Sequence, residues 1–113
     1  HTGVIIMADH GLHYGGFFKE PHRAQAEQEH GRPYATFILP KRMVTEQLKE
    51  NVKRMVNIRD IHMTIRDMAS FPSRSTTDVA SPIARSLLHD TISPERTCEE
   101  MMVNRKYRAA CTK

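Results

Sequence analysis

Two short apolar segments constrain the fold of this 113-residue chain more than any other feature. The first, Gly3–Ala8, is a continuous run rich in β-branched residues, and it ends at the polar residues 9 and 10. A run of this length and composition is typical of a strand buried on both faces, inside a parallel sheet covered by helices. The second, Tyr34–Leu39, has the same character and stops at Pro40. We therefore expect an α/β chain with a buried, mainly parallel sheet flanked by helices.

The apolar content of the chain is low for a folded domain. Leu, Ile, Val and Phe number 23 of 113 residues, about a fifth, which is near the limit below which chains stay disordered. The net charge of +4 is too small to favour disorder, so we expect one domain with a thin core. No apolar run approaches the roughly 18 residues that a membrane span needs. The chain begins with His1 and shows no signal peptide, so we expect a processed start or a piece of a longer protein.

Helical periodicity appears only in the second half of the sequence. Residues 9–33 contain several Gly and Pro residues without a sustained period, which predicts a long loop. Apolar residues then recur at helical spacing over 44–56, with Thr45 as the cap, and over 58–68, with Asp60 near the start. Residues 70–82 are rich in Ser, Thr and Pro and predict a surface loop, and 95–108 predict a last helix. We expect a main portion over residues 1–69 and a loop-rich tail over residues 70–113.

The charge pattern does not favour nucleic-acid binding. The 17 Lys and Arg residues are spread among 13 acidic residues, and aromatic residues make up only 6% of the chain. Nucleic-acid interfaces need basic residues gathered on one face, with aromatic residues for stacking. We therefore expect no nucleic acid among the partners.

The clearest candidate for chemistry is the pair Asp9-His10, placed where the first apolar run ends and followed by Gly11. In open α/β sheets, ligands bind beyond the carboxyl ends of the strands. A carboxylate beside an imidazole is a suitable half-set of ligands for zinc or another divalent cation. The alternative is that Asp9 only caps the loop and His10 is a solvated surface residue.

The remaining His and Cys residues carry weaker signals. His22 and His30 lie on the predicted loop and are able to approach a metal, although no spacing demands it, whereas His62 sits in a predicted helix and is best explained by packing. His1 and His89 carry no signal. Cys98 and Cys111 lack the second pair that a zinc finger needs.

Four segments, taken in order, resemble a known family. Residues 1–15 resemble the strand and the "SDHG-L-R-(F/Y)-G" segment of an animal sulfatase-like family of unassigned function, within the alkaline phosphatase and sulfatase superfamily of metal-dependent hydrolases. Residues 37–40 resemble its strand that ends in Leu-Pro. Asn51 with residues 59–65 resembles its "N…L-T…D-(V/I)-H-x-T-L" segment. Residues 86–88 and then 94–98 resemble its "S-L…N-R-T-C" stretch.

The resemblance implies a fold, a reaction and site residues. The fold implied is the carboxyl-terminal fragment of an alkaline-phosphatase-like sandwich. Asp9 and His10 inherit the role of ligands to a divalent cation, which is zinc, calcium, magnesium or manganese. The substrate implied is a phosphate or sulfate ester. His13 stands where the family has Arg and is the candidate contact to that ester.

Two further implications concern what lies outside the site. The nucleophile of such hydrolases lies upstream of the Asp-His pair, so we expect a partial hydrolase that is inactive alone. The family is secretory or membrane-anchored, with cysteines near its carboxyl end. The resemblance therefore implies a secretory or extracellular location and a Cys98–Cys111 disulfide, with free thiols as the alternative. The rival interpretation of the chain is a truncated or degenerate, non-catalytic α/β interaction fragment. If the chain is a fragment without its amino-terminal half, exposed sheet edges predict self-association.

Overall fold

The computed structural model describes residues 2–12, 14–75, 83–103 and 111. Two units make up the chain, one formed by His1–Ile38 with Val103–Lys113 and the other by Leu39–Met102. The first is called the strand unit here and the second the helical unit. The expected division between residues 69 and 70 stays a prediction.

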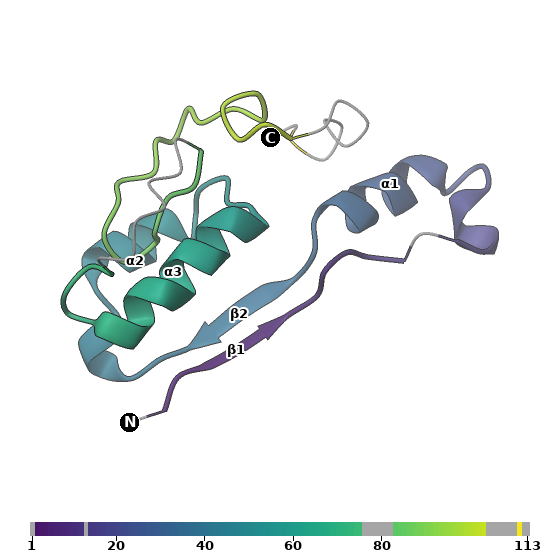
Figure 1. Cartoon of the computed structure of the whole chain (residues 1–113). Coiled ribbons are helices and arrows are strands. Elements are labelled where there is room, and N and C mark those ends of the chain that lie inside the picture. The colour runs from purple at the N-terminus through teal and green to yellow at the C-terminus, as the bar shows by residue number, and fades with distance from the viewer. Residues whose placement is uncertain (1, 13, 76–82, 104–110, 112–113) are drawn as a thin grey trace. The chain divides into compact units, whose positions relative to one another are not determined.

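The strand unit contains a two-stranded antiparallel sheet (Figure 1). Strand β1 (Val4–Met7) pairs with β2 (Ala35–Ile38), with Val4 opposite Ile38 and Met7 opposite Ala35. The pairing is antiparallel because the chain leaves β1 at its Met7 end and returns to that same end. A parallel pair needs a crossover that brings the chain back to the opposite end.

The expectation of a buried, mainly parallel sheet flanked by helices is therefore wrong for the described residues. Both apolar runs do form strands, but each strand has one neighbour, and their side chains are not buried on both faces. Val4 is 44% exposed, Ile6 53% and Ile38 56%. An apolar run shows that a strand is suited to burial, but its composition does not reveal how many strands flank it or in which direction they run.

The segment between the strands is more ordered than the predicted loop. It forms a 3-10 helix, η1 (Gly16–Phe18), and an α-helix, α1 (Arg23–Gly31). Helix α1 has one buried residue, Ala26, so it has no apolar stripe for a periodicity argument to detect. Its support comes from i,i+4 contacts such as Arg23 to Glu27 at 3.0 Å, and this hydrogen bond raises the pKa of the Arg23 guanidinium.

The helical unit begins with η2 (Lys41–Met43) and the short helix α2 (Glu46–Asn51). The predicted cap is confirmed, because the Thr45 hydroxyl accepts a hydrogen bond from the Leu48 amide at 3.1 Å. The helix is shorter than the predicted 44–56. Asn57 caps the next helix from an extended conformation, so a helical backbone cannot continue through it.

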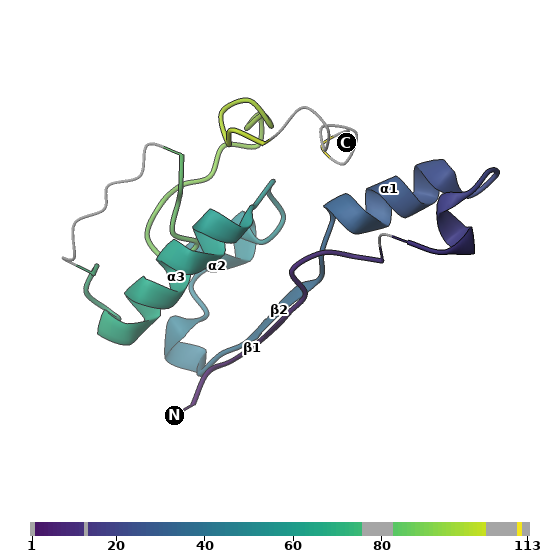
Figure 2. The ribbon, with the colours of Figure 1, turned by 45° about the vertical axis from the view of Figure 1, so that its right-hand side comes forward.

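Helix α3 (Ile58–Ser70) confirms the second periodic set (Figure 2). It opens with a capping box, in which the Asn57 side chain accepts from the Asp60 amide at 3.1 Å. The Asp60 carboxylate in turn accepts from the Asn57 amide at 2.8 Å. This exchange satisfies two backbone donors that the start of a helix otherwise leaves unpaired.

Residues 83–103 contain no helix or strand, yet they supply three of the five residues of the buried cluster in the helical unit. The buried cluster joins two residues from the start of this unit to three from that segment: Met43, Leu48, Leu87, Leu88 and Ile92. Of the predicted helix over 95–108, residues 95–103 form turns instead, and residues 104–108 lie outside the described residues. Within the described parts of the chain, no helix has the length and apolar character of a membrane span.

Candidate functional site

Asp9 and His10 lie immediately beyond the paired part of β1. The Ala8 amide donates to the Tyr34 carbonyl at 2.9 Å, one step past the last strand pair, so Asp9 is the first residue that the sheet does not hold. The sheet therefore fixes where this segment begins, as the position of the pair in the sequence suggested.

The two side chains are turned toward each other. The His10 amide donates to Asp9 Oδ1 at 2.9 Å, and His10 Nε2 lies 3.5 Å from Asp9 Oδ2. Asp9 is 88% exposed at its side chain and His10 43%, so both are accessible to an ion from solution.

A hydrogen bond to the backbone fixes the tautomer of His10. His10 Nδ1 lies 2.7 Å from the Gly11 carbonyl oxygen, which is only an acceptor, so the ring hydrogen resides on Nδ1. In the neutral ring, Nε2 then carries the lone pair, and this is the atom facing Asp9. Metal-bound His residues commonly donate their other ring nitrogen to a backbone carbonyl in this way. The donor set of Asp9 and His10 thus fits two positions of a divalent cation site.

The structure adds His30, from the last turn of α1, to this neighbourhood. The ring centroids of His10 and His30 are 5.1 Å apart, and His30 Nδ1 lies 3.3 Å from the same Gly11 oxygen. The sequence marked His30 only as one of two histidines on a loop. The other, His22, stacks on Phe17 at the opposite end of α1, with centroids 5.8 Å apart.

The ligand set is incomplete in the part of the chain that the structure describes. Within those residues, no group of three or more His, Cys, Asp or Glu side chains is arranged to hold a metal ion. A catalytic zinc typically has three protein ligands. His13, the candidate contact to the ester, lies outside the described residues.

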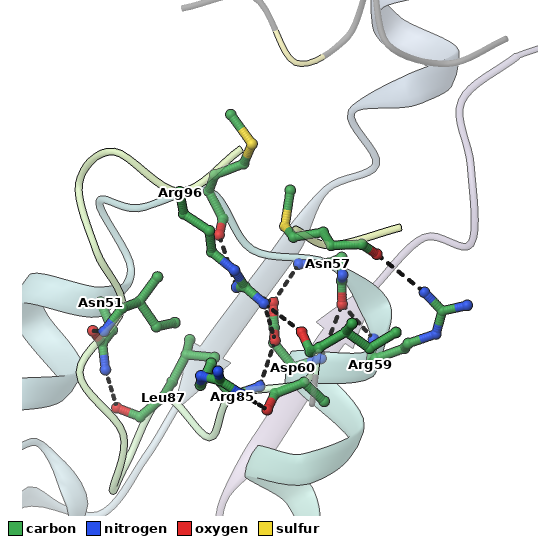
Figure 3. A network of polar contacts seen from close by, with 12 residues as sticks. Asn51, Asn57, Arg59, Asp60, Arg85, Leu87 and Arg96 are labelled. Atoms are coloured by element: carbon green, nitrogen blue, oxygen red, sulfur yellow. Dashed lines mark hydrogen bonds and ion pairs between the residues drawn. The ribbon is translucent and has the colours of Figure 1, made fainter. Parts of the chain in front are cut away.

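A second polar arrangement, in the helical unit, was not predicted from the sequence. The Asp60 carboxylate is fully buried and binds the guanidinium of Arg96 through contacts of 2.7 Å and 3.0 Å (Figure 3). The same carboxylate accepts from the Arg85 amide at 2.6 Å. Arg96 also donates to the carbonyls of Met55 and Ile83, at 3.2 Å and 2.6 Å.

Two further buried side chains tie the helices to residues 86–92. The Thr64 hydroxyl donates to the Asp60 carbonyl at 2.7 Å and accepts from the Leu87 amide at 2.9 Å. Asn51 donates to the carbonyls of Leu87 and Asp90 at 2.9 Å and 2.7 Å. Together with the Asp60–Arg96 pair, these contacts connect α2 and α3 with a segment that has no backbone ladder of its own.

The comparison with known protein families covers the whole chain. Residues 1–113 match the family model described as "Protein of unknown function (DUF229)". The chain therefore belongs to this family, which is a sulfatase-like family of unknown function. No curated protein and no solved structure matches the chain.

The motif residues that carry the resemblance fall into two groups, those exposed at the end of β1 and those buried in the helical unit. Asp9 and His10 stand exposed at the end of β1. Asn51, Asp60, Thr64 and Arg96 are instead buried in the helical unit and are fully used in holding it together. These four are explained by folding, so they are not candidates for contact with a substrate.

Cys98 and Cys111 are both disulfide-bonded. They are the two cysteines of the chain, so the pairing that the resemblance implied is present in the structure. The alternative of free thiols does not apply.

Proposed function

We propose that this chain is the carboxyl-terminal part of a metal-dependent phosphate- or sulfate-ester hydrolase, in which Asp9 and His10 bind a divalent cation. The observation that carries the proposal is the His10 ring, whose Nδ1 donates to Gly11 while Nε2 lies 3.5 Å from Asp9 Oδ2. This arrangement presents a carboxylate oxygen and an imidazole nitrogen side by side. Membership of a sulfatase-like family supports the reaction class.

The roles of the two residues follow from their chemistry. Asp9 contributes negative charge and a hard oxygen ligand, and His10 contributes a nitrogen whose orientation the Gly11 carbonyl fixes. A divalent cation bound here supplies positive charge beside a nucleophile and an anionic ester. His13, by resemblance, contacts the ester. The nucleophile belongs to a preceding segment, so the chain alone is a partial hydrolase.

Metal binding by the full chain tests this proposal. Equilibrium dialysis against zinc, calcium, magnesium and manganese is followed by measurement of bound metal for the wild type, Asp9→Ala and His10→Ala. We expect each variant to weaken binding of the preferred ion by at least about tenfold.

Matched controls exist for both residues. Glu46 is 86% exposed, comparable to the 88% of Asp9, and it lies in the helical unit. His62 is an exposed histidine on α3. Glu46→Ala and His62→Ala should bind metal as the wild type does. Equal binding by Asp9→Ala and the wild type would remove the site assignment.

A second candidate function rests on a different observation, the exposed apolar face of the two-stranded sheet. Val4 and Ile38 are direct partners across the strands and Ile6 is two residues along, so the three share one face, and they are 44%, 56% and 53% exposed. Isolated two-stranded sheets are marginally stable. We infer an interaction role in which the sheet self-associates through its open edges.

Sedimentation of the full chain over a range of concentrations tests the self-association. Ile6→Lys should shift the protein toward the monomer, because a charge on the strand opposes edge pairing. Val52→Lys is the matched control, since Val52 is 54% exposed and lies outside the sheet. A wild type that is monomeric at every concentration would overturn this candidate.

The disulfide supports a secretory or extracellular location as part of the proposal. Structural disulfides persist in oxidising compartments and are rare in the cytosol. Thiol labelling of the protein, denatured directly from expressing cells without reductant, should leave both cysteines unlabelled. Two labelled cysteines would contradict the location.

A further inference from the structure

A single residue, His30, contacts both backbone polar groups of Gly11. The Gly11 amide donates to the His30 carbonyl at 3.4 Å, and the His30 ring donates from Nδ1 to the Gly11 carbonyl at 3.3 Å. The same Gly11 oxygen accepts from His10 Nδ1 at 2.7 Å. Two imidazoles, one from the strand end and one from α1, thus share one carbonyl oxygen.

This sharing has a physical consequence for the peptide that joins Gly11 to Leu12. A carbonyl oxygen has two lone pairs and is able to accept both ring hydrogens. Glycine restricts its own backbone less than any other residue, so this peptide plane is free to rotate unless something holds it. The contacts from His30 supply that restraint at both ends of Gly11, and the His10 ring takes its orientation from the carbonyl so held.

The restraint depends on a close approach between the turn at Gly11 and helix α1. A Cβ atom placed on Gly11 would lie 2.3 Å from the Glu29 carbonyl oxygen, which is too close for any side chain. Residue 11 therefore lies directly against the last turn of α1, and the distance from His30 to the turn is set by backbone packing.

We propose that His30 is a positioning residue that fixes the orientation and tautomer of the His10 ring through the Gly11 carbonyl. Its consequence for metal affinity rests on the proposed function, whereas its effect on the His10 ring does not. Hydrogen-bond partners that orient a metal-bound His typically contribute about 10- to 100-fold to metal affinity. The competing interpretation is that His30 is itself a metal ligand.

Two variants of the full chain separate these interpretations. His30→Asn keeps a side-chain donor close to the position of Nδ1. His30→Phe keeps a ring that is able to maintain the edge contact to Phe18, where the centroids are 6.4 Å apart, but it has no donor. The first readout is the ¹⁵N spectrum of the His10 ring in metal-free protein, at a pH where imidazoles are neutral. The second is zinc affinity by calorimetry.

We expect His30→Asn to keep the Nδ1–H tautomer of His10 and to bind zinc within about threefold of the wild type. His30→Phe should mix the two tautomers and weaken zinc binding by about 10- to 100-fold. A His10 spectrum that is unchanged in His30→Phe would overturn the positioning role. Equal loss of zinc binding in both variants, with an unchanged His10 tautomer, would assign His30 as a ligand and also overturn it.

The readouts also separate this inference from the proposed function. A wild type that fails to bind zinc, or any of the other three cations, counts against the proposed function. In that case a His10 tautomer that responds to His30→Phe but not to His30→Asn still supports the positioning role. The His62 ring, on α3, is the internal reference, and its spectrum should be the same in all three proteins.

Discussion

The Asp60 carboxylate and the Arg96 guanidinium form an ion pair withdrawn from solvent, with side-chain exposures of 0% and 8%. The two contacts of 2.7 Å and 3.0 Å join the first turn of α3 to a segment 36 residues further along the chain. Both Asp60 oxygens also accept backbone hydrogen bonds, from Asn57 and Arg85. A charge held this way is costly to desolvate, and it is tolerated because every acceptor position is used.

Removal of Arg96 should therefore destabilise the helical unit severely. Arg96→Met keeps much of the apolar stem but leaves the Asp60 charge buried without a counter-ion, and it removes donors from the Met55 and Ile83 carbonyls. We expect a loss of about 3–5 kcal/mol in the free energy of unfolding. Urea unfolding followed by circular dichroism measures it.

The control for Arg96→Met is a second ion pair in the same unit. Arg74 binds Asp90 through two contacts of 2.8 Å, but Arg74 is 53% exposed, so Arg74→Met should cost about 0–1 kcal/mol. Adding Asp60→Asn to Arg96→Met should recover part of the loss, because it removes the unpaired charge. Equal losses for the two Arg variants would show that burial of the Asp60 pair does not matter.

Substitutions at Thr64 should show how much one buried hydroxyl contributes to the free energy of unfolding. Thr64→Val keeps the shape of the side chain but leaves the buried Leu87 amide without its acceptor at 2.9 Å. We expect a cost of about 1–3 kcal/mol in unfolding free energy. Thr64→Ser retains the hydroxyl and should lose less than Thr64→Val. The reverse order would mean that the methyl group, and not the hydrogen bond, is what the site requires.

Asn51 uses all of its hydrogen-bonding capacity. Its amide nitrogen donates to Leu87 and Asp90, and its oxygen accepts from Ile92 at 3.1 Å and Gln47 at 3.2 Å. Asn51→Asp has nearly the same volume, yet it sets a carboxylate against two carbonyl oxygens. We expect a loss of about 2 kcal/mol or more, compared with under about 1 kcal/mol for Gln47→Ala, in parallel urea titrations.

The sequence predicted the local elements of the fold better than their arrangement. The apolar runs became β1 and β2, the Thr45 cap is present, and the apolar period over residues 58–68 became α3. The direction of strand pairing was wrong, because a run of apolar residues carries no information on its neighbours. Helix α1 was missed because its composition, rich in Ala, Gln and Glu, favours a helix without producing an apolar stripe.

The candidate site was predictable only where its residues are adjacent in sequence. Asp9 and His10 follow a strand directly, so their position could be inferred. His30 reaches the same place because α1 packs on Gly11, a contact between residues 19 positions apart that no local pattern encodes. The Asp60–Arg96 pair was missed for the same reason. Its one local signal was an acidic residue three positions after Asn57, the spacing of a capping box.

The pH dependence of an exposed ion pair gives a prediction with a definite sign. The hydrogen bond from Lys53, at 2.7 Å, and then the charge of Lys53 lower the pKa of Glu50. A carboxyl whose pKa is lowered by folding stabilises the folded state above its ordinary pKa, and the contribution is lost as the pH falls through the lowered value. The wild type should thus be slightly more stable to unfolding than Glu50→Gln at about pH 7. This difference in stability should disappear below about pH 4. Urea midpoints at both pH values check this, and added salt should reduce the difference.

Gly11 should be difficult to replace, because α1 packs directly against it. In Gly11→Ala the new Cβ would meet the Glu29 carbonyl oxygen at 2.3 Å, and because that atom is backbone, the turn and α1 must separate. Strain of this kind costs about 1–3 kcal/mol, and the separation should also withdraw His30 from the Gly11 carbonyl. Gly16→Ala is the control, since a Cβ there has nothing within 4 Å. Urea unfolding and zinc calorimetry on both variants should show lower stability and weaker binding for Gly11→Ala alone. A Gly11→Ala protein that matches Gly16→Ala in both measurements would contradict the close packing of the turn on α1.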